Sequence, residues 1–125
     1  MSVRVKHVSE EASPSDGTRV LVDRLWPRGR TKASLPLDRW CRDIAPSTEL
    51  RQWFKHDPDK WEEFQRRYRR ELTAHAVLVG ELVAIAETGT LTLVFAASAR
   101  AHNNAVALAA ALAEQHLPSR SRNKR

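Results

Sequence analysis

Three runs of apolar residues along the chain predict β-strands. In residues 3–8, apolar and polar side chains largely alternate, which is typical of a strand with one buried face. Residues 19–25 form a nearly continuous apolar run with charged residues at its ends, as expected of a central strand covered on both faces. Residues 91–97 form another such run, and a turn-rich segment at residues 13–17 separates the first two strands.

Periodic apolar positions predict helices in the middle and at the end of the chain. Ser47 is expected to cap a helix over residues 48–55, and Asp57 to cap a second helix that starts at Pro58. Further helices are expected from about residue 78 to 89 and from about residue 101 to 115. The second helix has apolar residues at three- or four-residue steps, namely Trp61, Phe64, Tyr68 and Leu72. The last helix has inward-facing positions at Ala105, Leu108, Ala109 and Leu112.

This order of elements predicts an α/β fold. Two apolar strands separated by a long helical connection cannot form a hairpin, so they are expected to be parallel. We expect a small, mostly parallel sheet flanked by helices, in a single domain over residues 1–117. A length of 125 residues fits one domain of common size.

The basic charge of the chain is concentrated at its end. The formal net charge is +6, and four of the basic residues lie within the last six positions. Residues 118–125 contain no apolar residue that could be buried, so we expect a disordered basic tail there. Such a tail attracts polyanions weakly and in a salt-dependent way, so nucleic acid is only weakly supported as a partner.

Several classes of protein are disfavoured by features that the sequence does not contain. No apolar run approaches the ~20 residues that span a bilayer, and the first residues do not resemble a secretory signal. Cys41 is the only cysteine and is expected to be a buried thiol, which fits a cytoplasmic protein. The zinc motifs C-x-x-C and H-E-x-x-H and the glycine-rich nucleotide motifs are missing, so neither a metal nor a cofactor is expected.

Two loops that follow strands carry the candidate chemistry. Ligands of open parallel sheets bind beyond the carboxyl ends of the strands, where residues 23–29 and 98–104 are expected to meet. Arginines present forked donors that suit phosphate or carboxylate, and a helix N-terminus favours an oxyanion. The candidate anion-binding residues are Arg24, Arg28, Arg100 and Asn103, with Trp26, Ser98 and Asn104 as further pocket residues. Asp23 is the candidate catalytic base or the group that orients an arginine.

Some of these candidate site residues are also explained by a structural role. Asp23 and Arg24 would also serve to fix their loop, and Asn103 is explained by helix capping. His56 and Asp57 are adjacent, but the capping role of Asp57 explains the pair without a catalytic dyad. The arginines of residues 66–70 are typical of a solvated helix face that could also touch phosphates.

The motifs of this chain resemble those of the YeaO-like family, domain of unknown function 488. The resemblance rests on residues 22–29, on residues 45–51 and on His56-Asp57-Pro58, and it covers nearly all of residues 1–117. It implies a compact cytosolic protein of bacteria or archaea. After the last strand such proteins often read aromatic-x-Ala-Lys, whereas here Ser98 and Ala99 follow and the next cation is Arg100.

Two functional interpretations follow. In the first, the chain is a small enzyme or sensor that binds an anionic, phosphate- or carboxylate-bearing small molecule at the arginine-rich loop. In the second, it is a nucleic-acid-associated or protein-interaction module that uses the helix face at residues 66–70 and the basic tail. Neither interpretation specifies a substrate, a reaction or an oligomeric state.

Overall fold

A computed structural model of the chain describes the backbone of residues 1–122 and the side chains of residues 1–114. Its strands are β1 (Ser2–His7), β2 (Thr18–Leu21), β3 (Arg39–Trp40) and β4 (Thr90–Phe95). Its α-helices are α1 (Thr48–Phe54), α2 (Trp61–Leu72), α3 (Ala76–Thr88) and α4 (Asn104–Arg122). Residues 123–125, at the end of the predicted tail, lie outside the described residues, and the tail stays a prediction.

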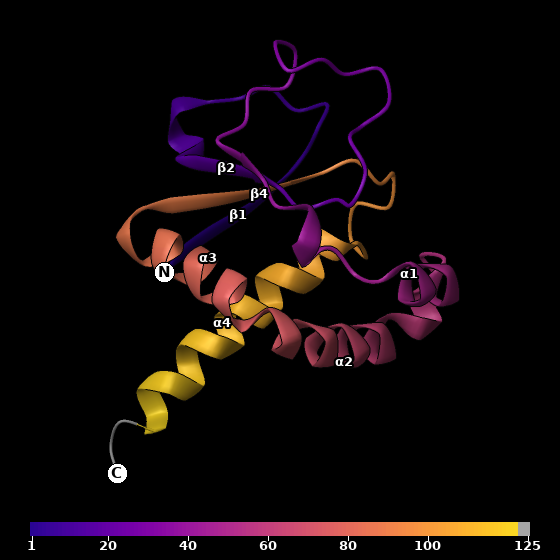
Figure 1. Cartoon of the computed structure of the whole chain (residues 1–125), viewed down its shortest axis with the longest axis vertical. Coiled ribbons are helices and arrows are strands. Elements are labelled where there is room, and N and C mark those ends of the chain that lie inside the picture. Colours follow the sequence, from indigo (N-terminus) through magenta and orange to yellow (C-terminus); the bar gives the residue numbers. More distant parts are fainter. Residues whose placement is uncertain (123–125) are drawn as a thin grey trace.

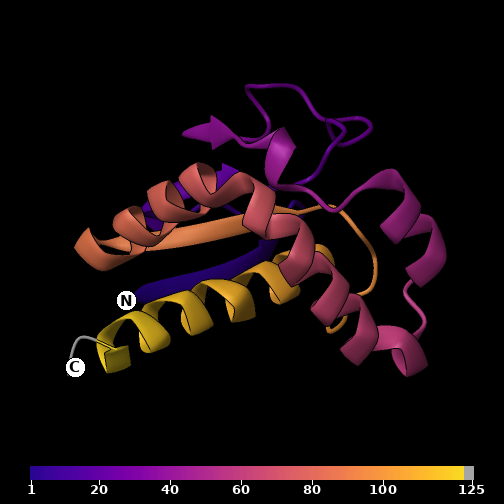
Figure 2. The same cartoon turned by 60° about the horizontal axis from the view of Figure 1, so that its bottom comes forward.

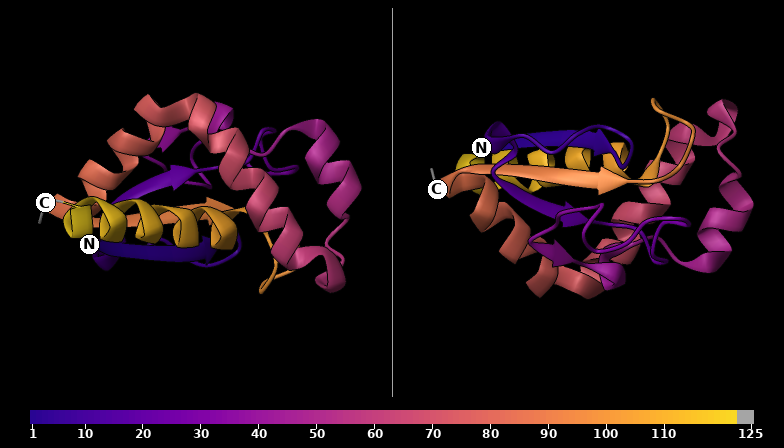
Figure 3. Two further views of the ribbon diagram at one scale, coloured as in Figure 1. Left: turned by 90° about the horizontal axis from the view of Figure 1, so that it is seen from below. Right: turned by 90° about the horizontal axis from the view of Figure 1, so that it is seen from above.

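The four strands form one parallel sheet in the order β1-β4-β2-β3. The α/β class and the mostly parallel sheet predicted from the sequence are therefore confirmed. Helices α3 and α4 pack against β1 and β4, and they lie on one face of the sheet in Figures 1 and 2. The two views of Figure 3 place α1 and α2 beyond the carboxyl ends of the strands, where a ligand of a parallel sheet is expected.

The core is divided between the two faces of the sheet. Alternate residues of β4 point to opposite faces, so Leu91 and Leu93 pack with the helices while Val94 packs on the other side. On that side Val94 meets Leu21 and Leu35. The segment between β2 and β3 therefore forms a cover over one face in place of a helix.

The two helix starts predicted from the capping residues Ser47 and Asp57 are confirmed. The hydroxyl of Ser47 accepts a hydrogen bond from Leu50 N (3.1 Å), and the Asp57 carboxylate accepts one from Asp59 N (3.0 Å). Asp57 caps a single 3-10 turn, η3 (Pro58–Lys60), that leads directly into α2. Three of the four predicted stripe residues of α2 are buried, namely Phe64, Tyr68 and Leu72.

The second strand is shorter than the apolar run that predicted it. The ladder of β2 ends at Leu21, one further backbone bond joins Val22 N to Val94 O (3.1 Å), and Leu25 is 67% exposed. The reason is that Asp23 turns its carboxylate onto Ala96 N (2.9 Å), which replaces strand pairing by a side-chain bond. The chain is thereby released into a loop at residue 23.

Candidate functional site

A pocket of about 500 Å³ opens at the carboxyl ends of β2 and β4. The loop after β2 contributes residues 23–28, and α4 contributes Asn104 at its first position. The opposite wall comes from the segment before α1, from α1, from the turn after α1 and from α2. The residues of this wall are Ala45, Pro46, Arg51, Phe54, His56 and Phe64. The pocket thus lies where parallel α/β sheets bind ligands.

The Asp23 carboxylate joins three elements at the base of the pocket. Its Oδ2 accepts from Ala96 N (2.9 Å), and its Oδ1 accepts from the Asn104 side-chain amide (3.0 Å). The same Asn104 amide donates to Val22 O (3.1 Å). Burial raises the pKa of Asp23, while these hydrogen bonds and the positive charge of Arg51 act in the opposite direction. Asp23 therefore holds the ends of β2, β4 and α4 together.

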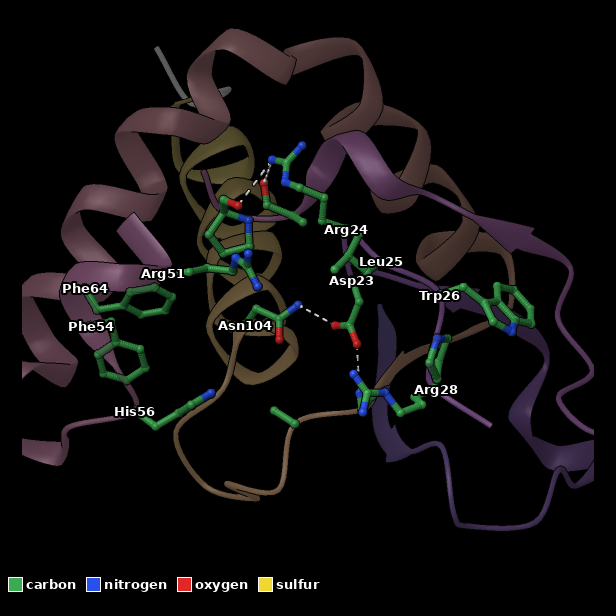
Figure 4. A pocket seen from close by; sticks show the side chains of 15 residues that line it. Asp23, Arg24, Leu25, Trp26, Arg28, Arg51, Phe54, His56, Phe64 and Asn104 are labelled. Atoms are coloured by element: carbon green, nitrogen blue, oxygen red, sulfur yellow. Dashed lines mark hydrogen bonds between the residues drawn. The ribbon is translucent and has the colours of Figure 1, made fainter. Parts of the chain in front are cut away.

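Arg24 uses its guanidinium to tie the loop to the opposite wall. Its Nη2 donates to Pro46 O (3.2 Å) and more weakly to Ala45 O (3.4 Å). Its Nε is buried and has no hydrogen-bond partner within the described residues. Figure 4 shows this side chain directed toward the carbonyl groups. The predicted role of Arg24 as an anion contact stays a prediction.

Two other guanidinium groups line the pocket without being engaged. Arg28 comes from the loop after β2, and Arg51 from α1. Within the part of the chain that the structure describes, neither guanidinium group has a hydrogen bond or an ion pair. Both residues are exposed, so their donors are available to a ligand.

The turn after α1 brings His56 to the pocket. Lys55 and His56 are the non-glycine residues with positive φ in the described chain, at 50° and 55°. Two successive left-handed residues reverse the chain after Phe54, a conformation that costs free energy in non-glycine residues. The His56 Nδ1 lies 3.2 Å from His102 O, which fixes the ring at the wall. His56 is therefore held toward the pocket by both backbone and side chain (Figure 4).

Two phenyl rings form the apolar part of the wall. Phe54 and Phe64 are stacked, with their centroids 4.2 Å apart, and both are almost fully buried in the core. Both rings belong to the pocket lining, with Phe54 3% and Phe64 1% exposed. The pocket therefore combines free cations with an aromatic surface.

Comparisons with known proteins show the family to which this chain belongs. A family model described as "Inactive DUF488-N3 subclade" matches residues 2–124. The chain belongs to this DUF488 subclade. It is 42% identical over 109 residues to the uncharacterized protein YeaO of Escherichia coli, covering 87% of this chain and 95% of YeaO. It is 44% identical over 107 residues to an uncharacterized protein of Mycobacterium tuberculosis, covering 86% of this chain and 90% of that protein. No solved structure matches this DUF488 chain.

Part of the predicted site of this DUF488 chain lies outside the pocket wall. The Asn103 amide is buried and caps α4, since its Oδ1 accepts from Val106 N (3.0 Å) and its Nδ2 donates to Ala99 O (2.8 Å). Arg100 is 3.7 Å from a carboxylate oxygen of Glu10. Neither residue lines the pocket, and neither does Ser98. Trp26 does line it, with its Nε1 donating to Arg30 O (2.7 Å).

Residues of α1 and α2 were missed by reasoning from strand ends alone. Arg51 and Phe54 are three positions apart on one short helix, so they share a face. That spacing, together with the N-cap at Ser47, indicates which side chains of the helix lie together. It does not indicate that this face turns toward the sheet, which depends on how α1 packs.

Neither a metal-ion cluster nor a membrane-spanning helix is found among the described residues. Among residues 1–114, whose side chains the structure describes, no group of three or more histidine, cysteine or acidic residues is placed to hold a metal ion. No helix within the described backbone of this DUF488 chain is long and apolar enough to cross a membrane. Cys41 is buried as predicted, and burial raises the pKa of its thiol.

Proposed function

We propose that the pocket binds a small molecule bearing phosphate or carboxylate, and that the chain is a binding protein or sensor rather than a catalyst. The observation that carries the proposal is the pair of unengaged guanidinium groups, Arg28 and Arg51, on two sides of one pocket. Forked arginine donors match the geometry of phosphate and carboxylate oxygens. Of this pair, Arg28 belongs to the anion-binding residues expected from the sequence, whereas Arg51 does not.

The charge balance of the lining supports an anionic ligand. The lining includes Arg24, Arg28 and Arg51, whereas Asp23 is its only carboxylic acid. Burial raises the pKa of Asp23, which makes its negative charge less favourable than that of an exposed carboxylate. An anion that enters the pocket therefore meets a net positive environment.

The surroundings of Asp23 argue for binding without catalysis. Each of its oxygens already accepts a hydrogen bond, from Ala96 N or from Asn104. A general base needs a lone pair within reach of the substrate proton, and these contacts compete for it. The family description also calls the subclade inactive. We assign Asp23 the role of positioning the loop that carries Arg28.

Replacing either free arginine is expected to weaken anion binding without unfolding the chain. A hydrogen bond to a charged group contributes about 1.5–3 kcal/mol, so Arg28→Ala or Arg51→Ala should raise Kd by roughly 10- to 100-fold. Isothermal titration with inorganic phosphate, sulfate, citrate and sugar phosphates measures this change.

Lys32→Ala is the matched control, because it removes one positive charge near the same loop from a residue outside the lining. It should leave Kd within about twofold. If Lys32→Ala weakened anion binding as much as Arg28→Ala, the loss of affinity would come from the net charge of the chain and not from a contact of Arg28 in the pocket. No binding of any small anion to the parent chain would overturn the proposal.

The nucleic-acid alternative has less support. On the basic face of α2, the Arg66 and Arg67 side chains both bind Glu63 at 2.9 Å, and Arg69 pairs with Glu114 at 3.1 Å. These partners neutralise part of the charge that a phosphate backbone would need. An oligonucleotide included in the same titration, at two salt concentrations, tests this surface separately.

A further inference from the structure

The pocket is much larger than a simple oxyanion requires. Its volume of about 500 Å³ lies within the range of roughly 300–1,000 Å³ that holds drug-sized ligands. A water molecule takes only about 30 Å³ in the liquid, and a phosphate ion has only five heavy atoms. Two arginines would hold the phosphate and leave most of the space to another part of the ligand.

The remaining space is bounded by flat rings. In Figure 4 the rings of Phe54, Phe64 and His56 lie on one side of the pocket, Arg28 lies on the other, and Arg51 lies between them. Phe54 stacks on Phe64 at 4.2 Å, and the centroid of His56 is 5.5 Å from that of Phe54. Aromatic surfaces of this kind favour stacked or edge-on contact with another ring.

The positioning of His56 points to a ligand contact as well. Holding two non-glycine residues at positive φ costs free energy, and such strain concentrates where a side chain must be presented. With Nδ1 directed to His102 O, the ring face and Nε2 are left for the pocket. The strained turn thus adds a third ring to the aromatic wall formed by Phe54 and Phe64.

We propose that the occupant is an anion attached to a flat ring, such as an aryl or heteroaryl phosphate or carboxylate. Its anionic group lies between Arg28 and Arg51, and its ring lies against Phe54, Phe64 and His56. This inference rests on the proposed function, because it assigns the ligand class of the same pocket. Aromatic contact distinguishes this class from sugar phosphates and inorganic anions, which share only the charge.

A series of phosphate monoesters tests the inference on the full chain. Isothermal titration would compare phenyl phosphate with cyclohexyl phosphate and methyl phosphate, which carry the same head group. We expect phenyl phosphate to bind at least about tenfold more tightly than methyl phosphate and more tightly than the cyclohexyl ester.

Two variants locate the ring. His56→Asn removes the imidazole while keeping a residue that tolerates positive φ, and Phe54→Leu removes a phenyl ring while keeping an apolar side chain. Each should reduce the preference for phenyl over methyl phosphate by about threefold or more. Phe95→Leu is the matched control, since Phe95 is also 3% exposed but lies outside the pocket lining. It should leave the preference unchanged.

The outcomes separate this inference from the proposed function. Equal affinity for the phenyl and methyl esters would overturn the ring preference and leave anion binding in place. Equal affinity for the phenyl and cyclohexyl esters would overturn the requirement for a flat ring. A preference that survives both His56→Asn and Phe54→Leu would place the ring elsewhere and overturn the assignment. No binding of any ester or of inorganic phosphate would overturn both proposals.

Discussion

Replacing Asp16 by asparagine is expected to lower the free energy of unfolding by about 3–5 kcal/mol, because it leaves buried cations without their counter-charge. The Asp16 side chain is fully buried. Its carboxylate lies 2.7 Å from Arg19 Nη1 and 2.8 Å from Lys6 Nζ, and both cations are themselves largely buried. It also accepts from Ser13 N at 3.0 Å. Asparagine keeps an oxygen but brings an amide group toward the same cations.

The same substitution should change how stability depends on pH. Burial alone would raise the pKa of Asp16, but the hydrogen bonds from Lys6, Ser13 N and Arg19 outweigh it and lower the pKa to about 2. A carboxyl with a depressed folded-state pKa contributes stability above its unfolded value of 3.8, and that contribution is lost as pH falls toward 2. The difference in free energy of unfolding between the parent and Asp16→Asn should therefore have its full size at pH 6 and become smaller between pH 4 and pH 2.

Urea denaturation followed by circular dichroism at several pH values measures both effects. Glu81→Gln is a useful comparison, because its ion pair with Arg39 is exposed on both sides and exposed pairs contribute about 1 kcal/mol or less. If Asp16→Asn lost no more free energy of unfolding than Glu81→Gln, the stabilising role assigned to the buried cluster of Asp16, Lys6 and Arg19 would be contradicted. A difference that stays constant down to pH 2 would contradict it as well.

The Asp16 cluster shows where local sequence patterns stop being informative. Residues 13–17 are recognisable as a turn, and the structure places a capped 3-10 turn there, η1 (Pro14–Asp16). The burial of Asp16 follows from tertiary structure, since Lys6 comes from β1 and Arg19 from β2, on either side of β4. No spacing along the chain indicates that these two cations converge.

The pocket residues, too, could be predicted from the sequence only in part. Asp23, Arg28 and Asn104 were predicted because strand ends in parallel sheets converge on one edge, and the structure places all three in the pocket wall. Arg24 and Arg28 look equivalent in the sequence, yet one side chain bonds to backbone carbonyls and the other is unengaged. That distinction depends on the docking of the segment before α1, which no local pattern encodes.

Replacing Gly17 by alanine is the second substitution with a large expected effect. It should lower the free energy of unfolding by about 3 kcal/mol or more. Gly17 has φ 64° and ψ −129°, a region that residues with a side chain rarely adopt, and such strain alone costs about 1–3 kcal/mol. A Cβ at this position would also collide with the backbone carbonyl of Thr90. Thr90 is the first residue of β4, which pairs with both β1 and β2, so the collision displaces the centre of the sheet.

Two other glycines separate strain from collision. Gly29 has φ 80° but open space where a Cβ would lie, so Gly29→Ala should cost only the strain, about 1–3 kcal/mol. Gly80 lies inside α3 with open space around it, and Gly80→Ala should raise stability by about 0.5–1 kcal/mol through helix propensity. Thermal and urea unfolding should therefore show Gly80→Ala to be more stable than the parent. Gly29→Ala should be less stable than the parent, and Gly17→Ala should be the least stable of the three variants. If Gly17→Ala were no less stable than Gly29→Ala, the close approach of residue 17 to β4 would be wrong, and with it the packing that buries Asp16.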